Sequence, residues 1–576
     1  MSQNQDESTL STLSSRILAL LAALALCLVS ACGGGTERSF PDEDRLLERL
    51  MEEYVAARFS FYPVESTLAG LPGRDAVLGS FSRSDIAGRV LWLSDFHTKL
   101  MGLKLKALSQ PAYLDALWLT SLTKAELFDL ERRRLWARSV AFYGENIRTG
   151  LVSLLLAPDL ANRAEELGGR LDAISTLMSQ AGENLGEVPE SYRRDGVRSL
   201  LLCRDLLSEM PVLLEESVPS YRVAELSEKS RLSMRSLQTL LSRLSPEPAA
   251  APASPVLPLG KEGLSLYLLH HEMIDWPPDR ILLEAKEAIS VASNELTEVA
   301  LEHLADRDLP AILAENAPSE APAEDFTAFE ARARGFLEAG AGEDFPEGAI
   351  PVRLVPPYFL APEWVRLWRP ASLDPVKGVS LLASTAAKAN AREIELSTLA
   401  EVAGGYRLFV RQSESASLLR RVFRSRTASE GWKSWLLRRV LDRGYAEGDP
   451  ELRLRQIHRD LLDDLRLEAM VSIHAFGMTL GAAEQRFREI GLLSREAAAL
   501  EAERAAVDPG AGSAALGRLL LEELARDYLR SHPLISPEEL EDAFLSEGLV
   551  PLRLLRFKLL GIHAEKGIRG QEGIRR

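Results

Sequence analysis

The sequence predicts a mainly α-helical fold with a small β element. Over most of the chain, apolar residues recur three and four positions apart, the spacing of one buried helix face, and residues 45–61 show it clearly. Only two short stretches, 352–355 and 378–382, are convincing strand candidates. Hydrophobic residues make up 46% of the 576 positions, which is enough for a sizeable core.

The first 31 residues predict an export signal. Arg16 supplies a positive charge, and the apolar run from 17 to 29 is too short to span a membrane comfortably. The run ends in Val-Ser-Ala-Cys, which is similar to a bacterial lipobox, so we expect Cys32 to take a lipid. Residues 32–41 then form a flexible tether. An uncleaved anchor or an ordinary signal peptide is the alternative.

These features place the protein in the cell envelope, held to a membrane by its lipid. Glycine follows Cys32, so a retention signal of the aspartate type is absent from the sequence. In a host with two membranes we therefore expect an anchor in the outer membrane, with the protein facing the periplasm.

Two helical regions joined by a linker are expected after the tether. The N-terminal region is 42–245, the Pro- and Ala-rich linker is 246–260, the region with the candidate site is 261–563, and a tail follows at 564–576. A Pro- and Ala-rich exposed loop is expected at 317–324. The apolar spacing predicts helices over 45–61, 84–109, 111–138, 163–184, 189–216, 223–244, 279–305, 408–444, 452–477, 480–491, 494–506, 517–531 and 537–546.

The charge and the cysteine content exclude several functions. Acidic residues outnumber basic residues by 84 to 68, and the net charge of −16 argues against nucleic-acid binding, which needs a basic face. Of the three cysteines, Cys27 lies in the leader and Cys32 takes the lipid. Cys203 is then alone in the mature body, so we expect a buried core thiol and no disulfide there.

Several common catalytic motifs are absent from the sequence. It contains no G-x-S-x-G nucleophile elbow, no G-x-x-x-x-G-K-[ST] phosphate loop and no G-x-G-x-x-G after a strand. His270-His271-Glu272 suggests a metal ligand set, but Pro277-Pro278 closes the segment, so we expect a packing or surface role. Arg132-Arg133-Arg134 lies among acidic residues on a predicted helix and is expected to form a solvated face.

Four segments carry the strongest functional signal. They are Ala400-Glu401-Val402-Ala403-Gly404-Gly405-Tyr406, then Ser429-Glu430-Gly431-Trp432, then 466–474 ending in His474, and finally 544–552. In this order they resemble the bacterial domain-of-unknown-function 885 family, whose members are mostly lipoproteins or secreted proteins. The HExxPGH motif of that family looks like a zincin-type metallopeptidase site, and its EGW motif follows downstream.

The resemblance implies a large helical zincin-like fold with a small sheet beside the active helix. Glu401 falls on the glutamate that would act as general base on zinc-bound water, and Glu430 falls on a carboxylate ligand. Gly404-Gly405 keep a helix breaker that would bring the second motif position round. We expect Glu401, Glu430 and His474 to converge in space.

This chain departs from the family pattern at the residues that would bind metal. Ala400 and Tyr406 replace the two motif histidines, and alanine cannot bind a metal. Where the family has glutamate, aspartate, tyrosine and histidine, this chain has Leu437, Met470, Ala514 and Glu541. We therefore assign no catalytic residue, predict that zinc is absent, and interpret these residues as a vestigial site: Ala400, Glu401, Gly404, Gly405, Tyr406, Glu430, Arg466 and His474.

Three functions are consistent with the sequence. The first is a lipid-anchored, non-catalytic relative of a metallopeptidase-like family that binds a peptide or protein through the old cleft. The alternative is an active hydrolase or peptidase with an altered metal site, for which His458, His474 and Glu430 are one candidate ligand set. A structural envelope protein without a function in the cleft is the third.

Overall fold

The computed structural model describes residues 42–71, 73–244, 256–303, 309–314, 323–341, 349–360, 365–368, 379–385 and 390–561. The expected export signal, Cys32, the tether, most of the linker, most of the loop at 317–324 and the tail lie outside the described residues. The structure is 78% helical, and the described residues include one small sheet, which confirms the mainly α prediction.

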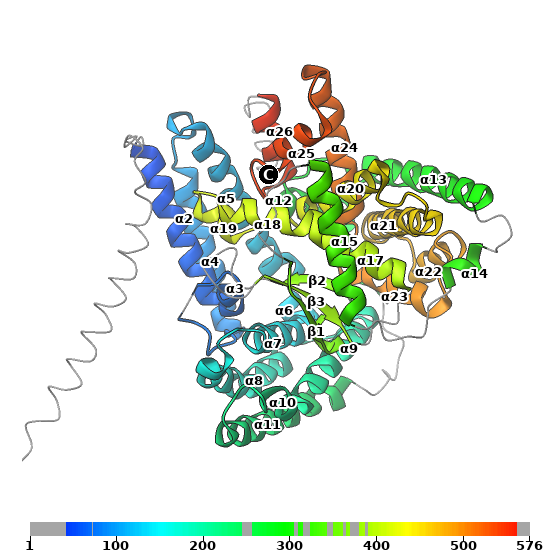
Figure 1. Ribbon diagram of the computed structural model, residues 1–576. Helices are drawn as coiled ribbons and strands as arrows, with labels where there is room; N and C mark the ends of the chain where they lie inside the picture. Colours follow the sequence, from blue (N-terminus) through cyan, green and yellow to red (C-terminus); the bar gives the residue numbers. More distant parts are fainter. Residues whose placement is uncertain are drawn as a thin grey trace, which may run out of the picture.

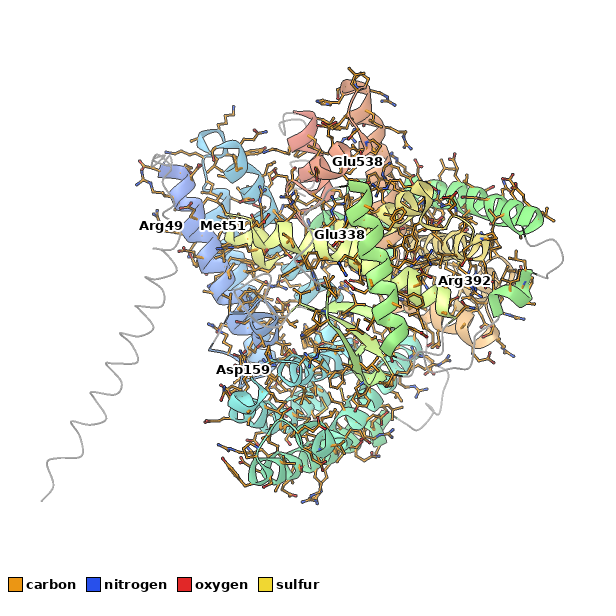
Figure 2. The ribbon with its side chains drawn as sticks, viewed as in Figure 1. Arg49, Met51, Asp159, Glu338, Arg392 and Glu538 are labelled. Atoms are coloured by element: carbon orange, nitrogen blue, oxygen red, sulfur yellow. The ribbon has the colours of Figure 1, made fainter. Side chains whose placement is uncertain are left out.

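Amphipathic helices form the N-terminal part, drawn blue to green in Figure 1. In the first of them, Met51 and Tyr54 are buried in the core whereas Arg49 faces solvent (Figure 2), as the three-to-four spacing predicts. Ser82 caps a later helix by accepting a hydrogen bond from the Asp85 N–H. The helices are α2 (Asp42–Phe61), α3 (Pro63–Leu68), α4 (Arg83–Met101), η1 (Leu105–Ala107), α5 (Gln110–Phe128), η3 (Leu160–Arg163), α8 (Ala164–Asn184), α9 (Glu190–Ser208), α10 (Met210–Leu214) and α11 (Ser220–Leu244).

Two stretches of this part differ from the prediction. The helix predicted over 111–138 widens after α5 into a π segment, η2 (Asp129–Arg133), and resumes as α6 (Leu135–Arg138). Arg134, between them, has left-handed backbone geometry with φ 51°. The helix α7 (Val140–Leu155) escapes prediction because it is buried nearly all round, so its apolar residues do not mark a single face.

The C-terminal part is also a stack of helices, in which α13 packs along α21 and α20 along α24. The helix predicted over 408–444 is divided into several pieces, and Ser425 starts the longest of them by accepting the Ala428 N–H. The helices are α12 (Gly260–Glu272), α13 (Pro278–His303), α14 (Leu309–Ala314), α15 (Ala323–Ala341), α16 (Pro357–Leu360), α17 (Ala391–Leu399), η4 (Ala400–Tyr406), α18 (Arg407–Ser413), α19 (Leu418–Val422), α20 (Arg426–Val440), η5 (Leu441–Tyr445), α21 (Pro450–Phe476), α22 (Leu480–Glu489), α23 (Arg495–Val507), α24 (Ser513–Ser531), α25 (Pro537–Leu545) and α26 (Leu552–Leu560).

A three-stranded sheet lies near the middle of the view in Figure 1. It consists of β1 (Val352–Val355), β2 (Val365–Trp368) and β3 (Ser380–Ser384), in the order β1-β3-β2. The central strand β3 is buried throughout, pairs parallel with β1 and pairs antiparallel with β2. Both strand predictions are confirmed, and the edge strand β2 is an addition to them. The π segment η4 packs against β2, so the sheet lies beside the candidate site.

One of the two hydrophobic clusters spans the chain, because it contains residues from Leu47 to Leu555. Cys203 belongs to it, fully buried, with its thiol donating to the Gly144 carbonyl at 3.1 Å. Burial raises the pKa of this thiol to about 12, and the prediction of a buried core thiol is confirmed. None of the helices that the structure describes has both the length and the apolar character needed to cross a bilayer.

Candidate functional site

The segment from Ala400 to Tyr406 forms the π turn η4 inside a continuous helix. Asn390 caps the start of α17 by accepting the Arg392 N–H at 2.9 Å, and the helix then runs through η4 into α18. Gly404 and Gly405 do not break the helix, so this expectation was wrong. A π turn adds a residue to one turn of the ladder, which redirects the following side chains without ending the helix.

The two glycines instead provide space for the neighbouring side chains. A Cβ atom at Gly404 would lie 3.0 Å from Cγ and 3.1 Å from Cα of Lys433 on α20. A Cβ atom at Gly405 would lie 2.7 Å from Oε2 of Glu401. At Gly404 the neighbour includes backbone, so a side chain there would force the two helices apart, whereas at Gly405 the carboxylate of Glu401 would have to move.

Lys433 joins the two carboxylates of the vestigial site. Its Nζ lies 2.9 Å from Oε1 of Glu401 and 3.0 Å from Oε2 of Glu430. Only 19% of the Lys433 side chain is exposed, and burial opposes its charge, but the two carboxylates outweigh burial and hold the pKa above its usual value. The ammonium group therefore neutralises the carboxylates from which the family resemblance would build a metal site.

Glu401 also stabilises the sheet. Its Oε2 accepts the N–H of Leu367 in β2 at 3.2 Å, while Oε1 binds Lys433. Where other parts of the protein cover an edge strand, a backbone N–H group without a hydrogen-bond acceptor costs free energy of folding. Both oxygens of the carboxylate that resembles a general base are thus engaged in structural contacts.

The donor set does not fit a catalytic zinc ion. Ala400 is 4% exposed and offers no ligand atom, and burial raises the pKa of the Tyr406 hydroxyl, which favours its protonated form. Lys433 holds the carboxylates of Glu401 and Glu430. Among the residues that the structure describes, no group of three or more His, Cys, Asp or Glu side chains is arranged to hold a metal.

His474 is held by a different set of contacts from those of Glu401 and Glu430. It is 1% exposed on α21, and its Nδ1 accepts the Leu259 N–H at 3.4 Å. Burial, followed by the charge of Arg133, lowers its pKa to about 4, so the ring is neutral at pH 7. Glu401 and Glu430 thus meet at Lys433, whereas the expected approach of His474 to them stays a prediction.

Arg466 and His458 have structural partners away from Glu401 and Glu430. Arg466 donates to both carboxylate oxygens of Glu501 at 2.7 Å and to Asp463 at 2.6 Å, which fastens α21 to α23. Nε2 of His458 lies 2.8 Å from the Gly491 carbonyl. In the described part of the chain, the alternative ligand set of His458, His474 and Glu430 is not arranged to hold a metal.

A second charged cluster, which sequence reasoning missed, surrounds the π segment η2. Asp129 lies 2.9 Å from Nη1 of Arg133 and 2.9 Å from Nε2 of His271. The rings of His271 and Tyr267 stack with their centres 4.2 Å apart, and the guanidinium carbon of Arg133 lies 5.1 Å from the centre of the Tyr267 ring. The solvated-face prediction therefore holds for Arg132 and Arg134, which are exposed, and was wrong for Arg133.

An ion pair between Arg426 and Asp508, at 2.8 Å, continues this cluster toward Glu430. The Arg426 and Asp508 side chains keep 42% and 30% of their surface exposed, and that of Glu430 keeps 41%. Burial is nevertheless the largest influence on the pKa of Arg426, and charge interactions with Asp508 and Glu430 offset it and raise this pKa. The charges of this region are therefore surrounded by protein and still reachable by water.

The segment His270–Glu272 contributes to packing, as expected. Glu272 is 8% exposed and accepts the Ser425 hydroxyl at 2.5 Å and the Thr427 N–H at 3.1 Å. The next residue, Met273, has left-handed geometry with φ 56°, which is unfavourable for a side chain of this type. Such strained residues and π turns concentrate at functional sites, and both occur around this cluster.

The EGW segment sets the distance between α20 and α24. A Cβ atom at Gly431 would lie 2.4 Å from the Cα of Gly517, and one at Gly517 would lie 2.1 Å from the Thr427 carbonyl oxygen. The two backbones are thus in direct contact, which brings Glu430 and Lys433 to the face of η4.

Glu541, at another changed family position, is fully buried and lies 3.3–3.4 Å from Arg407, Arg439 and Arg443.

Comparisons with known proteins agree with this architecture. The family model described as "Bacterial protein of unknown function (DUF885)" matches residues 63–559. A solved structure from Shewanella oneidensis, described as a "putative lipoprotein of unknown function", is 15% identical with a TM-score of 0.68, covering 89% of this chain and 99% of its own. One from Colwellia psychrerythraea, described as a "putative lipoprotein", is 14% identical with a TM-score of 0.75, covering 90% and 99%. No curated protein matches the chain.

Proposed function

The chain belongs to the bacterial DUF885 family, and from this premise we propose that it is a lipid-anchored envelope protein that binds a peptide or protein without metal-dependent catalysis. Anchoring is supported by the Val-Ser-Ala-Cys sequence ending at Cys32 and by the description of two proteins with the same fold as lipoproteins. We place the anchor in the outer membrane and the protein in the periplasm on the sequence argument alone.

The observation that carries the proposal is the position of Lys433. An ammonium group bound by Glu401 at 2.9 Å and by Glu430 at 3.0 Å already occupies the space between these carboxylates and balances half of their charge. A cation entering beside it would meet like-charge repulsion and, at Ala400, a position without a ligand atom. Without a metal, water keeps its high pKa and a glutamate has no activated nucleophile to deprotonate.

The charged cluster around η2 supports a binding role. Asp129 and Arg426 keep 35% and 42% of their side-chain surface exposed although burial is the largest influence on the pKa of each. Desolvated charges interact more strongly with a ligand than charges on an open surface. Cations and anions alternate there, and a peptide carries groups of both signs.

A peptide-library binding assay tests this function. We expect binding to the purified protein that excess chelator leaves unchanged, and we expect Arg426→Gln to weaken it about tenfold, the effect of losing roughly 1.4 kcal/mol. Arg231→Gln is the matched control, because Arg231 is 47% exposed and pairs only with the neighbouring Glu228 on α11 among its described contacts. Hydrolysis of library peptides that stops in Glu401→Gln would reject the proposal and favour the peptidase alternative.

A further inference from the structure

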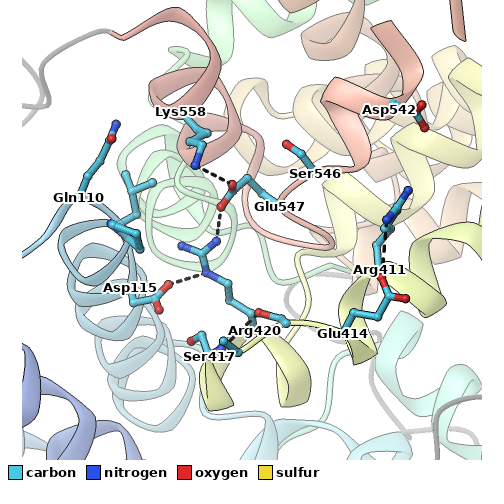
Figure 3. Close-up of a pocket in the computed structure, with 14 residues that line it drawn as sticks. Gln110, Asp115, Arg411, Glu414, Ser417, Arg420, Asp542, Ser546, Glu547 and Lys558 are labelled. Atoms are coloured by element: carbon cyan, nitrogen blue, oxygen red, sulfur yellow. Dashed lines mark hydrogen bonds and ion pairs between the residues drawn. The ribbon is translucent and has the colours of Figure 1, made fainter. Parts of the chain in front are cut away.

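A polar pocket of about 530 Å³ lies apart from the vestigial site, between α5, the α18–α19 turn, α25 and α26 (Figure 3). Its volume is within the range of small-molecule sites. On one wall, Arg420 lies 2.6 Å from Asp115 and also pairs with Glu547, which in turn lies 3.3 Å from Lys558. Asp115, Arg420 and Glu547 are only 7–11% exposed, and their ion pairs form a rigid wall in which Arg420 balances one carboxylate and Lys558 faces the other.

The accessible charges of the pocket are two cations and two anions. Arg411 and Lys558 keep 46% and 43% of their side-chain surface exposed, and Glu414 and Asp542 keep 57% and 58%. Each cation is held by a long ion pair, at 3.6 Å for Arg411–Glu414 and 3.3 Å for Lys558–Glu547. Such exposed pairs contribute little to the stability of the fold. A ligand with a phosphate and an ammonium group would satisfy both sets of charges.

The lining also discriminates between ammonium groups. A quaternary ammonium is usually bound in a cage of aromatic rings, and no aromatic side chain is among the described residues that line this pocket. Carboxylates such as Glu414 and Asp542 accept hydrogen bonds from a primary ammonium, which has N–H groups to donate. Ser415 can supply a hydroxyl donor for a phosphate oxygen, whereas the hydroxyl of Ser546 donates to the Ala543 carbonyl.

The pocket lies close to the start of the described chain. Its wall includes Gln110 and Pro111, which follow Ser109, and the Ser109 N–H donates to Asp44 in the first turn of α2 at 2.9 Å. The ten tether residues, 32–41, span at most about 33–36 Å when extended. In Figure 1 the start of α2, α26 and the α24–α25 turn lie toward the same upper end of the molecule. That turn carries Leu534, which is 96% exposed.

We propose that this pocket binds the headgroup of a phospholipid with a primary ammonium, of the phosphoethanolamine type, on the membrane that holds the anchor. The proposal rests on the lipid-anchoring part of the proposed function and is independent of peptide binding. Arg411 and Lys558 contact the phosphate, Glu414 and Asp542 accept the ammonium, and Leu534 enters the apolar layer beside them.

The test measures soluble headgroup and vesicle binding separately, using purified protein with Cys32→Ser to remove the anchor. Calorimetry should detect saturable binding of glycerophosphoethanolamine, at least tenfold tighter than glycerophosphocholine or glycerol phosphate. Lys558→Gln should weaken binding at least tenfold, whereas the control Lys261→Gln, which alters a 52% exposed lysine on α12, should not. Circular dichroism checks that each variant is folded.

Vesicle co-sedimentation then distinguishes a lipid from a free ligand. Vesicles containing phosphatidylethanolamine should bind the protein more tightly than vesicles of phosphatidylcholine alone. Leu534→Ser should reduce vesicle binding and leave soluble headgroup binding unchanged, and Leu232→Ser, at a 45% exposed position on α11, should change neither. No headgroup binding, equal affinity for glycerol phosphate, or an unaffected Lys558→Gln would each overturn the proposal. Headgroup binding without vesicle binding would assign the pocket to a free ligand.

Discussion

At the scale of single residues, the account depends on which side chain neutralises Glu401 and Glu430. Lys433 stands three positions after Glu430 on the same face of α20, so its ammonium group can bind Glu430 and Glu401 together. This residue could have been noticed in the sequence, because a lysine directly after the family-like Glu-Gly-Trp segment interrupts an otherwise largely buried helix face. That Lys433 binds Glu401 could not have been predicted from the sequence, because the two residues are 32 positions apart.

Removing the ammonium group should destabilise the fold. In Lys433→Met, Glu401 and Glu430 would face each other without a cation, and we expect the free energy of unfolding to fall by about 2–3 kcal/mol. Adding Glu401→Gln should recover part of the loss because it removes the repulsion. Urea denaturation measures both changes. A surface lysine, Lys229, pairs with the 60% exposed Asp172, and Lys229→Met should cost less than about 1 kcal/mol; equal losses in the two methionine variants would contradict the account.

His474 should make stability depend on pH. Its pKa is about 4 in the folded protein, against an ordinary value of 6.5, so the unfolded chain binds the proton more readily between these values. Stability is therefore lost as pH falls from about 6.5 to 4, by about 3 kcal/mol from this residue. His474→Gln should reduce the slope of unfolding free energy against pH in that window, and His532→Gln, at an exposed position, should not. An unchanged slope in His474→Gln would show that the ring is not held neutral.

At the scale of elements, glycines determine how closely the helices of the site approach. Gly431 and Gly517 bring the backbones of α20 and α24 into contact, and Gly404 admits Lys433 beside η4. The family-like segments are therefore retained in part for packing. The helix breaker was expected at Gly404-Gly405 because the family motif needs one there to bring its second histidine round, but here a π turn runs through both glycines.

Alanine substitutions test whether Gly431 is needed for helix packing. Gly431→Ala should lower the melting temperature strongly, because its Cβ would lie 2.4 Å from the backbone of Gly517, and backbone cannot yield as a flexible side chain can. Gly481→Ala, in α22 with nothing within 4 Å of the added Cβ, should leave stability unchanged or raise it by up to about 1 kcal/mol. Similar melting temperatures for the two variants would refute the packing role of Gly431.

The same scale shows what sequence patterns can and cannot predict. Helices with one buried face, such as α2 and α8, were predicted because their apolar spacing is regular. The helix α7 was missed because it is buried on nearly all sides, and the strand β2 because four residues with a mixed burial pattern carry little signal. The cluster of Asp129, Arg133 and His271 was missed because it forms between η2 and α12, which no local pattern connects.

At the scale of the whole molecule, one hydrophobic cluster joins the N-terminal and C-terminal regions. Its members extend from Leu47 in α2 to Leu555 in α26, and Arg420 of the C-terminal part pairs with Asp115 of α5 at 2.6 Å. Calorimetry should therefore give a single cooperative unfolding transition for the purified protein. Two separate transitions would show that the regions 42–245 and 261–563 unfold independently.

Membrane attachment is the second property of the whole molecule. Cys32→Ser removes the thiol that we expect to carry the lipid, and two acyl chains are needed where one gives only marginal attachment. After cell fractionation we expect the variant in the soluble fraction and the unaltered protein with the membranes. Retention of the variant with the membranes would mean that something other than the lipid holds the protein there.

The most direct test of the central claim, that Lys433 has replaced a metal ion between Glu401 and Glu430, is the zinc content of the protein purified without chelator. Mass spectrometry should find far less than one zinc per chain, and peptide hydrolysis that depends on Glu401 should be absent. One zinc per chain, together with hydrolysis that is lost in Glu401→Gln, would contradict the claim.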